Sequence, residues 1–324
     1  MKNMPAHFVI SVVMPAHNEQ VALPAIVRRV MTTLAPWPHE IIVIDDGSTD
    51  GTWEEIRALH EVHPQVRGIR LTRNFGHQAA LVAGLRAAKG AAVIMMDADG
   101  QHPAELLPEF VRLWRRGHTL VQGIRITAAE ERWLKRLTSR AFYRMWSLLS
   151  GVPIVRGSAD FRLIDRAALD AVLASAGSLV FLRGLIAWLG YEVRYIPFTA
   201  AARLGGCSSY TWLRMLQLSI DGLTAYSIVP LRIAMALGLS ISGLSLAYLC
   251  FVLGAWLGSM RVVSGWASTA GLMSLVGGIQ LFTVGVLGEY VGRIFLRTLD
   301  RPQFVVADEV GTSLGYRRRT GGAT

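Results

Sequence analysis

The sequence is poor in charged residues and in cysteine. Charged side chains make up 17% of its 324 residues, whereas soluble domains carry about 25%, so part of the chain is expected to lie in lipid. Cys207 and Cys250 are its two cysteines, which excludes a disulfide framework and a zinc site built on cysteine. The N-terminal segment lacks the long apolar core and the cleavage site of a signal peptide, and its pattern is that of a first strand.

Two common nucleotide-binding motifs are also missing. No Gly-x-Gly-x-x-Gly follows the first strand, and there is no Gly-x4-Gly-Lys-Ser/Thr. These absences argue against a dinucleotide-dependent oxidoreductase and against a P-loop nucleotidase.

Positive charge is in excess, with 33 Lys and Arg against 23 Asp and Glu, a net charge of +10. Such a balance suits nucleic acid, an anionic membrane face or a phosphorylated substrate. Because 52% of the residues are hydrophobic, the last two are favoured and no nucleic acid partner is expected.

Apolar runs of strand length alternate with helical patterns in the first part of the chain. This alternation predicts an α/β fold with a doubly wound, mostly parallel sheet. The expected strands are Phe8–Met14, Glu40–Ile44, Arg67–Leu71, Ala91–Met96, Thr119–Gly123 and Tyr191–Phe198, and the expected helices are Val21–Leu34, Trp53–His60, Gly76–Lys89 and Glu105–Arg116.

The fourth strand is followed by two carboxylates, Asp97 and Asp99. They lie at the strand's C-terminal end, the edge at which open α/β sheets bind ligands. A turn there lets both side chains converge, and two carboxylates suit Mg2+ or Mn2+, with water and substrate phosphates completing the coordination. A solvated loop end without a metal is the alternative, and the spacing alone does not decide between them.

Two long stretches lack charge altogether. Ile233–Leu257 has no charged residue over 25 positions, and Val262–Gly288 is a second uncharged stretch. At about 1.5 Å per residue each exceeds the roughly 30 Å hydrocarbon core, which predicts an antiparallel transmembrane hairpin rather than buried helices of a soluble domain. Arginines flank both outer ends of the pair, whereas the connecting loop holds Arg261 alone, so the positive-inside rule places both termini in the cytoplasm.

Two further segments have open interpretations. Glu130–Leu149 is a long helical stretch rich in arginine and lysine, which fits a solvated face or a surface against anionic headgroups. Tyr210–Tyr226 has an amphipathic pattern, which fits an interfacial helix or a helix packed on the globular domain.

Several motifs together resemble glycosyltransferase family 2, in its polyprenyl-phosphate branch. They are Pro-Ala-His-Asn-Glu (15–19), Asp-Asp-Gly-Ser-Thr-Asp-Gly-Thr (45–52), Asn-Phe-Gly-His-Gln (74–78), Asp-Ala-Asp-Gly-Gln-His-Pro (97–103), Asp-Phe-Arg-Leu (160–163), Arg-x-x-Gly-x-Ser (203–208) and Leu-Gly-Glu-Tyr-Val-Gly-Arg (287–293). The resemblance covers nearly the whole chain and keeps the order of the motifs. In these motifs the chain is similar to undecaprenyl-phosphate glucosyltransferases and dolichyl-phosphate mannose synthases.

The resemblance implies a GT-A catalytic domain, a nucleotide-sugar donor and a polyprenyl phosphate acceptor. It also implies roles for particular residues. Those for the nucleotide are Pro15, Ala16, Glu19, Ile44, Asp46, Met96, Asp97 and Ala98; those for the metal are Asp99 and Gln101; Arg125 neutralises phosphate; and Arg203 and Ser209 meet the acceptor phosphate.

Asp160 lies where the family has a candidate acidic residue. It acts as a general base, or it orients Arg162 or the sugar, and the sequence leaves both interpretations open. Relatives carry lysine at the place of Ser209 and leucine at the place of Gly100. The first departure removes a charge near phosphate, and the second is expected to change the shape of the loop.

The expected organisation has four parts: a cytoplasmic GT-A domain (1–208), amphipathic juxtamembrane helices (209–230), a two-helix transmembrane hairpin (231–292) and a cytoplasmic tail (293–324). The expected activity is metal-dependent inverting transfer of a hexose, glucose first, from a UDP-sugar or GDP-mannose to polyprenyl phosphate at the bacterial inner membrane. A homo-oligomer is expected. The alternatives are a catalytically silent nucleotide-sugar-binding scaffold and a processive polysaccharide synthase, although the Gln-x-x-Arg-Trp motif of such synthases is absent.

Overall fold

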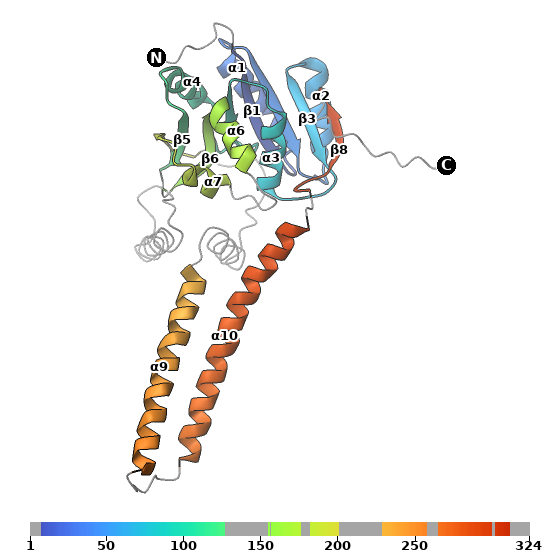
Figure 1. Cartoon of the computed structure of the whole chain (residues 1–324). Coiled ribbons are helices and arrows are strands. Elements are labelled where there is room, and N and C mark those ends of the chain that lie inside the picture. The colour runs from blue at the N-terminus through green and yellow to red at the C-terminus, as the bar shows by residue number, and fades with distance from the viewer. Residues whose placement is uncertain are drawn as a thin grey trace, which may run out of the picture. The chain divides into compact units, whose positions relative to one another are not determined.

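The computed structural model describes residues 8–126, 155, 157–175, 182–200, 229–257, 265–299 and 302–311. The chain divides into two compact units (Figure 1). One, here called the α/β unit, comprises Met1–Tyr143, Pro153–Thr211 and Arg301–Thr324; the other, the helix-pair unit, comprises Arg144–Val152 and Trp212–Asp300.

The α/β unit contains one sheet and the helices that cover it. Its strands are β1 (Ile10–Ala16), β2 (His39–Asp45), β3 (Val66–Leu71), β4 (Ala92–Met95), β5 (Leu120–Arg125), β6 (Ser158–Asp165), β7 (Val193–Phe198) and β8 (Val306–Val310). Its helices are α1 (Leu23–Leu34), α2 (Thr52–Val62), α3 (His77–Ala87), the short 3-10 helix η1 (Ala104–Leu106), α4 (Leu107–Arg115), α6 (Arg166–Ser175) and α7 (Leu182–Trp188).

The sheet is mixed, with strand order β7-β5-β6-β4-β1-β2-β3-β8. Strands β4, β1, β2 and β3 run parallel to one another, and β7 runs parallel to β5. Strand β6 is antiparallel to both of its neighbours, and β8 is antiparallel to β3. The predicted α/β fold of the GT-A type is therefore confirmed, and β6 and β8 supply its antiparallel pairings.

Both faces of the sheet are covered because the central strands are apolar on both sides. Val12 and Met14 of β1 pack in one core cluster with residues of α1 and α4, whereas Val13 packs in a second cluster with residues of α3 and α6. Successive strand residues point to opposite faces, so a strand buried on both sides has no polar alternation. Full burial of each such side chain contributes about 1.5–3 kcal/mol.

Strand β8 brings the end of the described chain into the sheet. It pairs with β3 in the register Ile69↔Glu309 and Arg70↔Asp308, and the Thr72 N–H donates to the Val305 carbonyl at 2.9 Å. Pairing with β3 thus sets the position of β8 near the end of the described chain.

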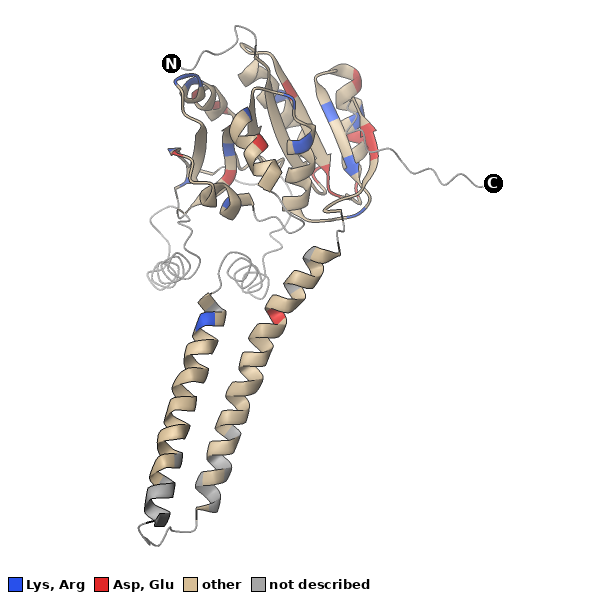
Figure 2. Ribbon diagram, in the orientation of Figure 1, with Lys and Arg blue, Asp and Glu red and all other residues tan. Residues whose placement is uncertain are grey.

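The helix-pair unit contains α9 (Val229–Leu257) and α10 (Trp266–Thr298). By length and composition, Leu231–Tyr248 and Leu275–Leu296 are candidate membrane spans. Large apolar side chains on them are exposed, such as Leu239 at 75% and Leu281 at 76%, and Figure 2 shows long uncharged stretches on both helices. A protein surface in water rarely carries so much contiguous apolar area.

Several predictions concern residues outside those described. They are the helices expected over 130–149 and 210–226, together with Arg203 and Ser209. The four-part organisation proposed from the sequence stays a prediction.

Candidate active site

The loops after β1, β2 and β4 meet at the edge where these parallel strands end. The loops after β1 and β2 are joined by hydrogen bonds. The N–H groups of Asn18 and Glu19 donate to the side-chain hydroxyls of Ser48 and Thr52, each at 3.0 Å, and the N–H of Thr49 donates to Asn18 Oδ1 at 2.8 Å. Asn18 adopts a positive φ of 58°. These contacts join the loops after β1 and β2 into one surface, here called the wall, on the side where the nucleotide is predicted to bind.

Asp46 holds a third loop against this wall. Its two carboxylate oxygens accept hydrogen bonds from the N–H groups of Phe75, at 2.8 Å, and Gly76, at 3.0 Å. Burial raises the pKa of the Asp46 carboxyl, against the effect of these two donors, which favour its charged form. The carboxylate therefore positions the loop that leads into α3, in addition to its predicted role in nucleotide binding.

The other predicted nucleotide residues cluster near the same edge. Pro15 lies opposite Ile44 in the sheet register, and Ala16 follows at the end of β1. The side chain of Ile44 is fully buried in the core, as are Met96 and Ala98. None of these three residues is exposed at the edge of the sheet in this structure. Glu19 is partly exposed at the wall described above.

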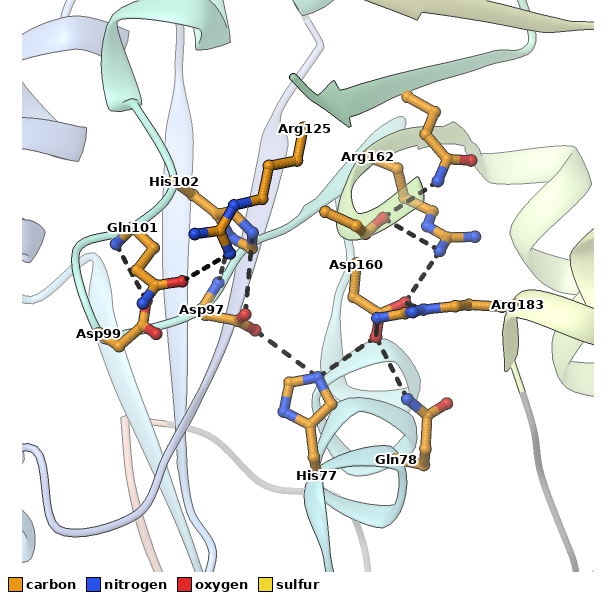
Figure 3. Close-up of polar contacts among 12 residues, drawn as sticks. His77, Gln78, Asp97, Asp99, Gln101, His102, Arg125, Asp160, Arg162 and Arg183 are labelled. Carbon is orange, nitrogen blue, oxygen red and sulfur yellow. Dashed lines mark hydrogen bonds and ion pairs between the residues drawn. The ribbon is translucent and has the colours of Figure 1, made fainter. Parts of the chain in front are cut away.

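The Asp-x-Asp loop follows β4, as predicted. The N–H of Gln101 donates to Asp99 Oδ1 at 3.0 Å, and Arg125 Nη1 donates to Gln101 Oε1 at 3.2 Å. Gly100 adopts φ +78°, a conformation that residues with a side chain rarely take. The structure thus brings together Asp97, Asp99, Gln101 and Arg125, four residues proposed from the sequence (Figure 3).

A divalent ion fits this loop as a shared site rather than a closed cage. Among the described residues no group of three or more His, Cys, Asp or Glu side chains converges to hold a metal. Asp97 Oδ1 is buried without a hydrogen-bond partner, and Asp99 and Gln101 add further oxygen donors on the same loop. Mg2+ and related ions are commonly held by one or two carboxylates plus substrate phosphates, and this donor set matches that arrangement.

Two histidines flank the Asp97 carboxylate. His77 Nε2 lies 3.6 Å from Oδ1 and His102 Nε2 lies 3.8 Å from Oδ2. His102 Nδ1 accepts from the Asp97 N–H at 2.9 Å, so its proton is on Nε2, facing the carboxylate. Burial lowers the pKa of His102, which also stacks on Phe161 with ring centroids 4.9 Å apart. A neutral imidazole thus holds the backbone of Asp97 by a hydrogen bond and lies beside its carboxylate.

His77 connects Asp97 to a second carboxylate. Its Nε2 lies 3.5 Å from Asp160 Oδ2. Burial alone would lower the pKa of His77, but the hydrogen bond to Asp160 and the charge of Asp97 raise it above its ordinary value. His77 begins α3 directly after the loop that Asp46 holds, so the wall and the two carboxylates form one connected structure.

Asp160, on β6, is almost completely enclosed by donors. Arg183 of α7 binds it through two nitrogens, each at 2.9 Å, Arg162 binds it at 2.9 Å, and Gln78 donates to it at 3.3 Å. Burial opposes its charge, but Arg183, His77 and Arg162 hold the pKa of the Asp160 carboxyl well below its ordinary value of 3.8. A carboxylate this weakly basic is poorly suited to remove a proton, so the geometry favours the orienting interpretation.

Sequence reasoning missed Arg183 and gave His77 no role. His77 lies within the 74–78 motif, which drew attention only as part of the family resemblance. Arg183 belongs to no motif that the sequence analysis used, and the helix that carries it was not predicted. No local pattern marks its approach to Asp160.

Comparison with known proteins identifies the family. The model for "Glycosyl transferase family 2" matches residues 11–173. The "Uncharacterized glycosyltransferase YkcC" of Bacillus subtilis is 34% identical, over 95% of this chain and 96% of its own length. The "Bactoprenol glucosyl transferase" of Shigella phage SfV is 33% identical, over 93% of this chain and 98% of its own length.

Solved structures give more distant likenesses. The mannosyltransferase PcManGT of Pyrobaculum calidifontis, in complex with GDP-Man and Mn2+, is 18% identical with a TM-score of 0.46, over 88% of this chain and 87% of that one. Glucosyl-3-phosphoglycerate synthase of Mycobacterium tuberculosis, in complex with Mn2+, UDP-Glc and phosphoglyceric acid, is 20% identical with a TM-score of 0.42, over 68% and 78%. The family match and the full-length relatives show that this chain is a glycosyltransferase and belongs to glycosyltransferase family 2.

Proposed function

We propose that this enzyme transfers a hexosyl group from a nucleotide sugar to a polyprenyl phosphate at the cytoplasmic face of a bacterial inner membrane, with glucose from UDP-glucose proposed before mannose from GDP-mannose. The observation that carries the proposal is the full-length similarity to proteins named bactoprenol glucosyl transferase, at 33% identity over more than 90% of this chain. The Asp-x-Asp loop and the two candidate spans support it.

The site supports a division of roles at the donor. Asp97 holds the nucleotide sugar, Asp99 and Gln101 hold Mg2+ or Mn2+, and Arg125 neutralises the diphosphate. When bound, the ion stabilises the negative charge that develops on the departing nucleoside diphosphate. Arg125, already hydrogen-bonded to Gln101 at 3.2 Å, adds to the same effect, which is stronger in the transition state than in the ground state.

The acceptor needs orientation more than activation. A phosphate monoester is already ionised near neutral pH, so its oxygen attacks the anomeric carbon without a general base, and inversion follows from in-line displacement. Placing two reactants in the reacting geometry removes much of the barrier. From the sequence, Arg203 and Ser209 are proposed to meet the acceptor phosphate; both lie outside the described part of the chain.

A membrane hairpin with both ends on one side fits the connectivity. The chain leaves the sheet after β7 and returns to it at β8, so any helices between these strands cross a bilayer an even number of times. Arginines near both outer ends, such as Arg232 and Arg301, against the single Arg261 between the uncharged stretches, favour the cytoplasmic side. The homo-oligomer stays a prediction.

The direct test is a transfer assay with the full chain in detergent. Polyprenyl phosphate, Mn2+ or Mg2+ and a panel of labelled nucleotide sugars are incubated with the enzyme, and label is counted in the organic phase. A product carrying one hexose is expected, most of all with UDP-glucose. Long glycan chains would favour the processive alternative, and no lipid-linked product with any donor would refute the proposal.

A further inference from the structure

Cationic groups lie on two opposite sides of Asp97. Figure 3 shows Arg125 with Asp99 and Gln101 on one side, and Asp160 with its arginines on the other, with His77 between. Contacts support this order, since Arg125 binds Gln101 at 3.2 Å and His77 Nε2 lies 3.6 Å from Asp97 and 3.5 Å from Asp160. The first group is the proposed donor diphosphate site, and the second has no role in that proposal.

Arg183 is the accessible member of the second group. Among the described residues, the guanidinium groups of Arg162 and Arg183 both pair with the carboxylate of Asp160. The side chains of Asp160 and Arg162 are 4% and 2% exposed, whereas that of Arg183 is 38% exposed. An anion that approaches from solvent therefore reaches the guanidinium of Arg183 rather than that of Arg162.

Asp160 fixes how Arg183 is presented. It accepts from both Nε and an Nη of Arg183 at 2.9 Å, which holds the guanidinium plane in a single orientation. Arg162 and Gln78 hold the carboxylate in turn, at 2.9 and 3.3 Å. Such support lowers the side-chain entropy that Arg183 would lose on gripping a ligand.

The geometry of in-line displacement indicates which anion Arg183 would bind. The leaving diphosphate and the attacking phosphate lie on opposite faces of the sugar in an inverting reaction. We infer that Arg183 binds the phosphate of the lipid acceptor, across Asp97 from the donor diphosphate, and that Asp160 is a positioning residue for Arg183 rather than a general base. This inference rests on the proposed function and adds Arg183 to Arg203 and Ser209 as a residue that meets the attacking phosphate.

The kinetic test uses the full chain with Arg183→Gln. Undecaprenyl phosphate is varied at saturating donor, and donor is varied at saturating acceptor. Loss of a charged hydrogen-bond donor is expected to raise KM for the acceptor roughly ten- to a hundredfold, with donor KM and donor hydrolysis without acceptor unchanged. Arg57→Gln, at an exposed arginine of α2, is the matched control and leaves all three unchanged.

A binding measurement separates this inference from the proposed function. Wild-type enzyme in nanodiscs is expected to bind undecaprenyl phosphate more tightly than undecaprenol, and Arg183→Gln to lose most of that preference, whether or not a tested donor gives turnover. Arg183→Lys, which keeps the charge and loses the fork, restores part of it. An undiminished preference for the phosphate, or a rise confined to donor KM, would overturn the assignment.

A triple variant covers the case in which Arg183→Gln fails to fold. Asp160→Asn and Arg162→Met, combined with Arg183→Gln, remove the carboxylate and both guanidinium groups that pair with it, so no buried charge is left alone. The triple variant is expected to fold and to show the same loss of acceptor binding. A folded triple variant with wild-type acceptor affinity would equally refute the inference.

Discussion

Removal of the Asp160 carboxylate is expected to be strongly destabilising. In Asp160→Ala, Arg162 stays in the interior at 1% exposure, with the Ala159 carbonyl as an acceptor at 3.3 Å. Its Nε is already buried without a partner. Arg183 is more exposed and can turn toward water, so the cost arises mainly at Arg162.

Breaking a buried ion pair on one side costs about 3–5 kcal/mol, a large part of the roughly 5–15 kcal/mol by which domains are stable. For a unit of this size about 1 kcal/mol lowers Tm by roughly 2–4 °C. Asp160→Ala should therefore lower the Tm of the α/β unit by about 6–20 °C, as the combination of those two ranges gives.

Thermal unfolding of the full chain in detergent, followed by intrinsic fluorescence, measures the effect. Asp170→Ala is the matched control, because Asp170 pairs with Arg166 at 3.5 Å but its side chain is 61% exposed, and such surface pairs contribute about 0–1 kcal/mol. Adding Arg162→Met to Asp160→Ala should recover most of the loss, since no buried charge then stands alone. A Tm for Asp160→Ala equal to that of the control would show that the charge is not buried as described.

Three other outcomes are expected. The pKa of the Asp160 carboxyl lies well below 3.8 in the folded state, so its charge stabilises the fold above the unfolded-state pKa and this contribution is lost as the pH falls through the folded pKa. In acid, the Tm of Asp160→Asn should therefore fall less steeply with pH than the Tm of wild type. Parallel curves of Tm against pH would contradict this. Chelation of divalent ions should stop transfer by wild-type enzyme, and added Mn2+ or Mg2+ should restore it. With the same ions, the turnover of Asp99→Ala should stay below that of wild type by about a hundredfold or more, at an unchanged Tm. Normal turnover of Asp99→Ala would show that Asp99 is not a metal ligand. Gly47→Ala should lower the Tm more than Gly190→Ala and should weaken donor binding. Both glycines have positive φ, but a Cβ at Gly47 would lie 2.4 Å from the Arg73 carbonyl carbon, whereas a Cβ at Gly190 would have nothing within 4 Å. Equal losses of Tm would show that the loop of Gly47 shifts to accept the added methyl group.

The parts of the fold that local pattern determines were predicted well. The apolar runs before Asp45 and Asp97 became β2 and β4, with the carboxylates at the expected edge. Both strands are buried over most of their length, so each is visible in the sequence as an apolar run.

Long-range pairing was beyond such reasoning. Strand β6 enters antiparallel between β4 and β5, and nothing in its own residues specifies two neighbours from distant parts of the chain. The same holds for the site, since His77, Asp97 and Asp160 come from α3, the loop after β4, and β6. The approach of Arg183 to Asp160 depends on how α7 packs on the sheet, which no single segment encodes.

Strand β8 covers the outer edge of β3 with only five residues, Val306–Val310. An uncovered edge presents a row of unsatisfied amides and carbonyls that recruits other strands. Shortening the chain at its C-terminus, a common step in preparing membrane enzymes, would therefore strip the protection from β3 and favour self-association. The last strand should be kept in any expressed form of the protein, even though no catalytic role is proposed for it.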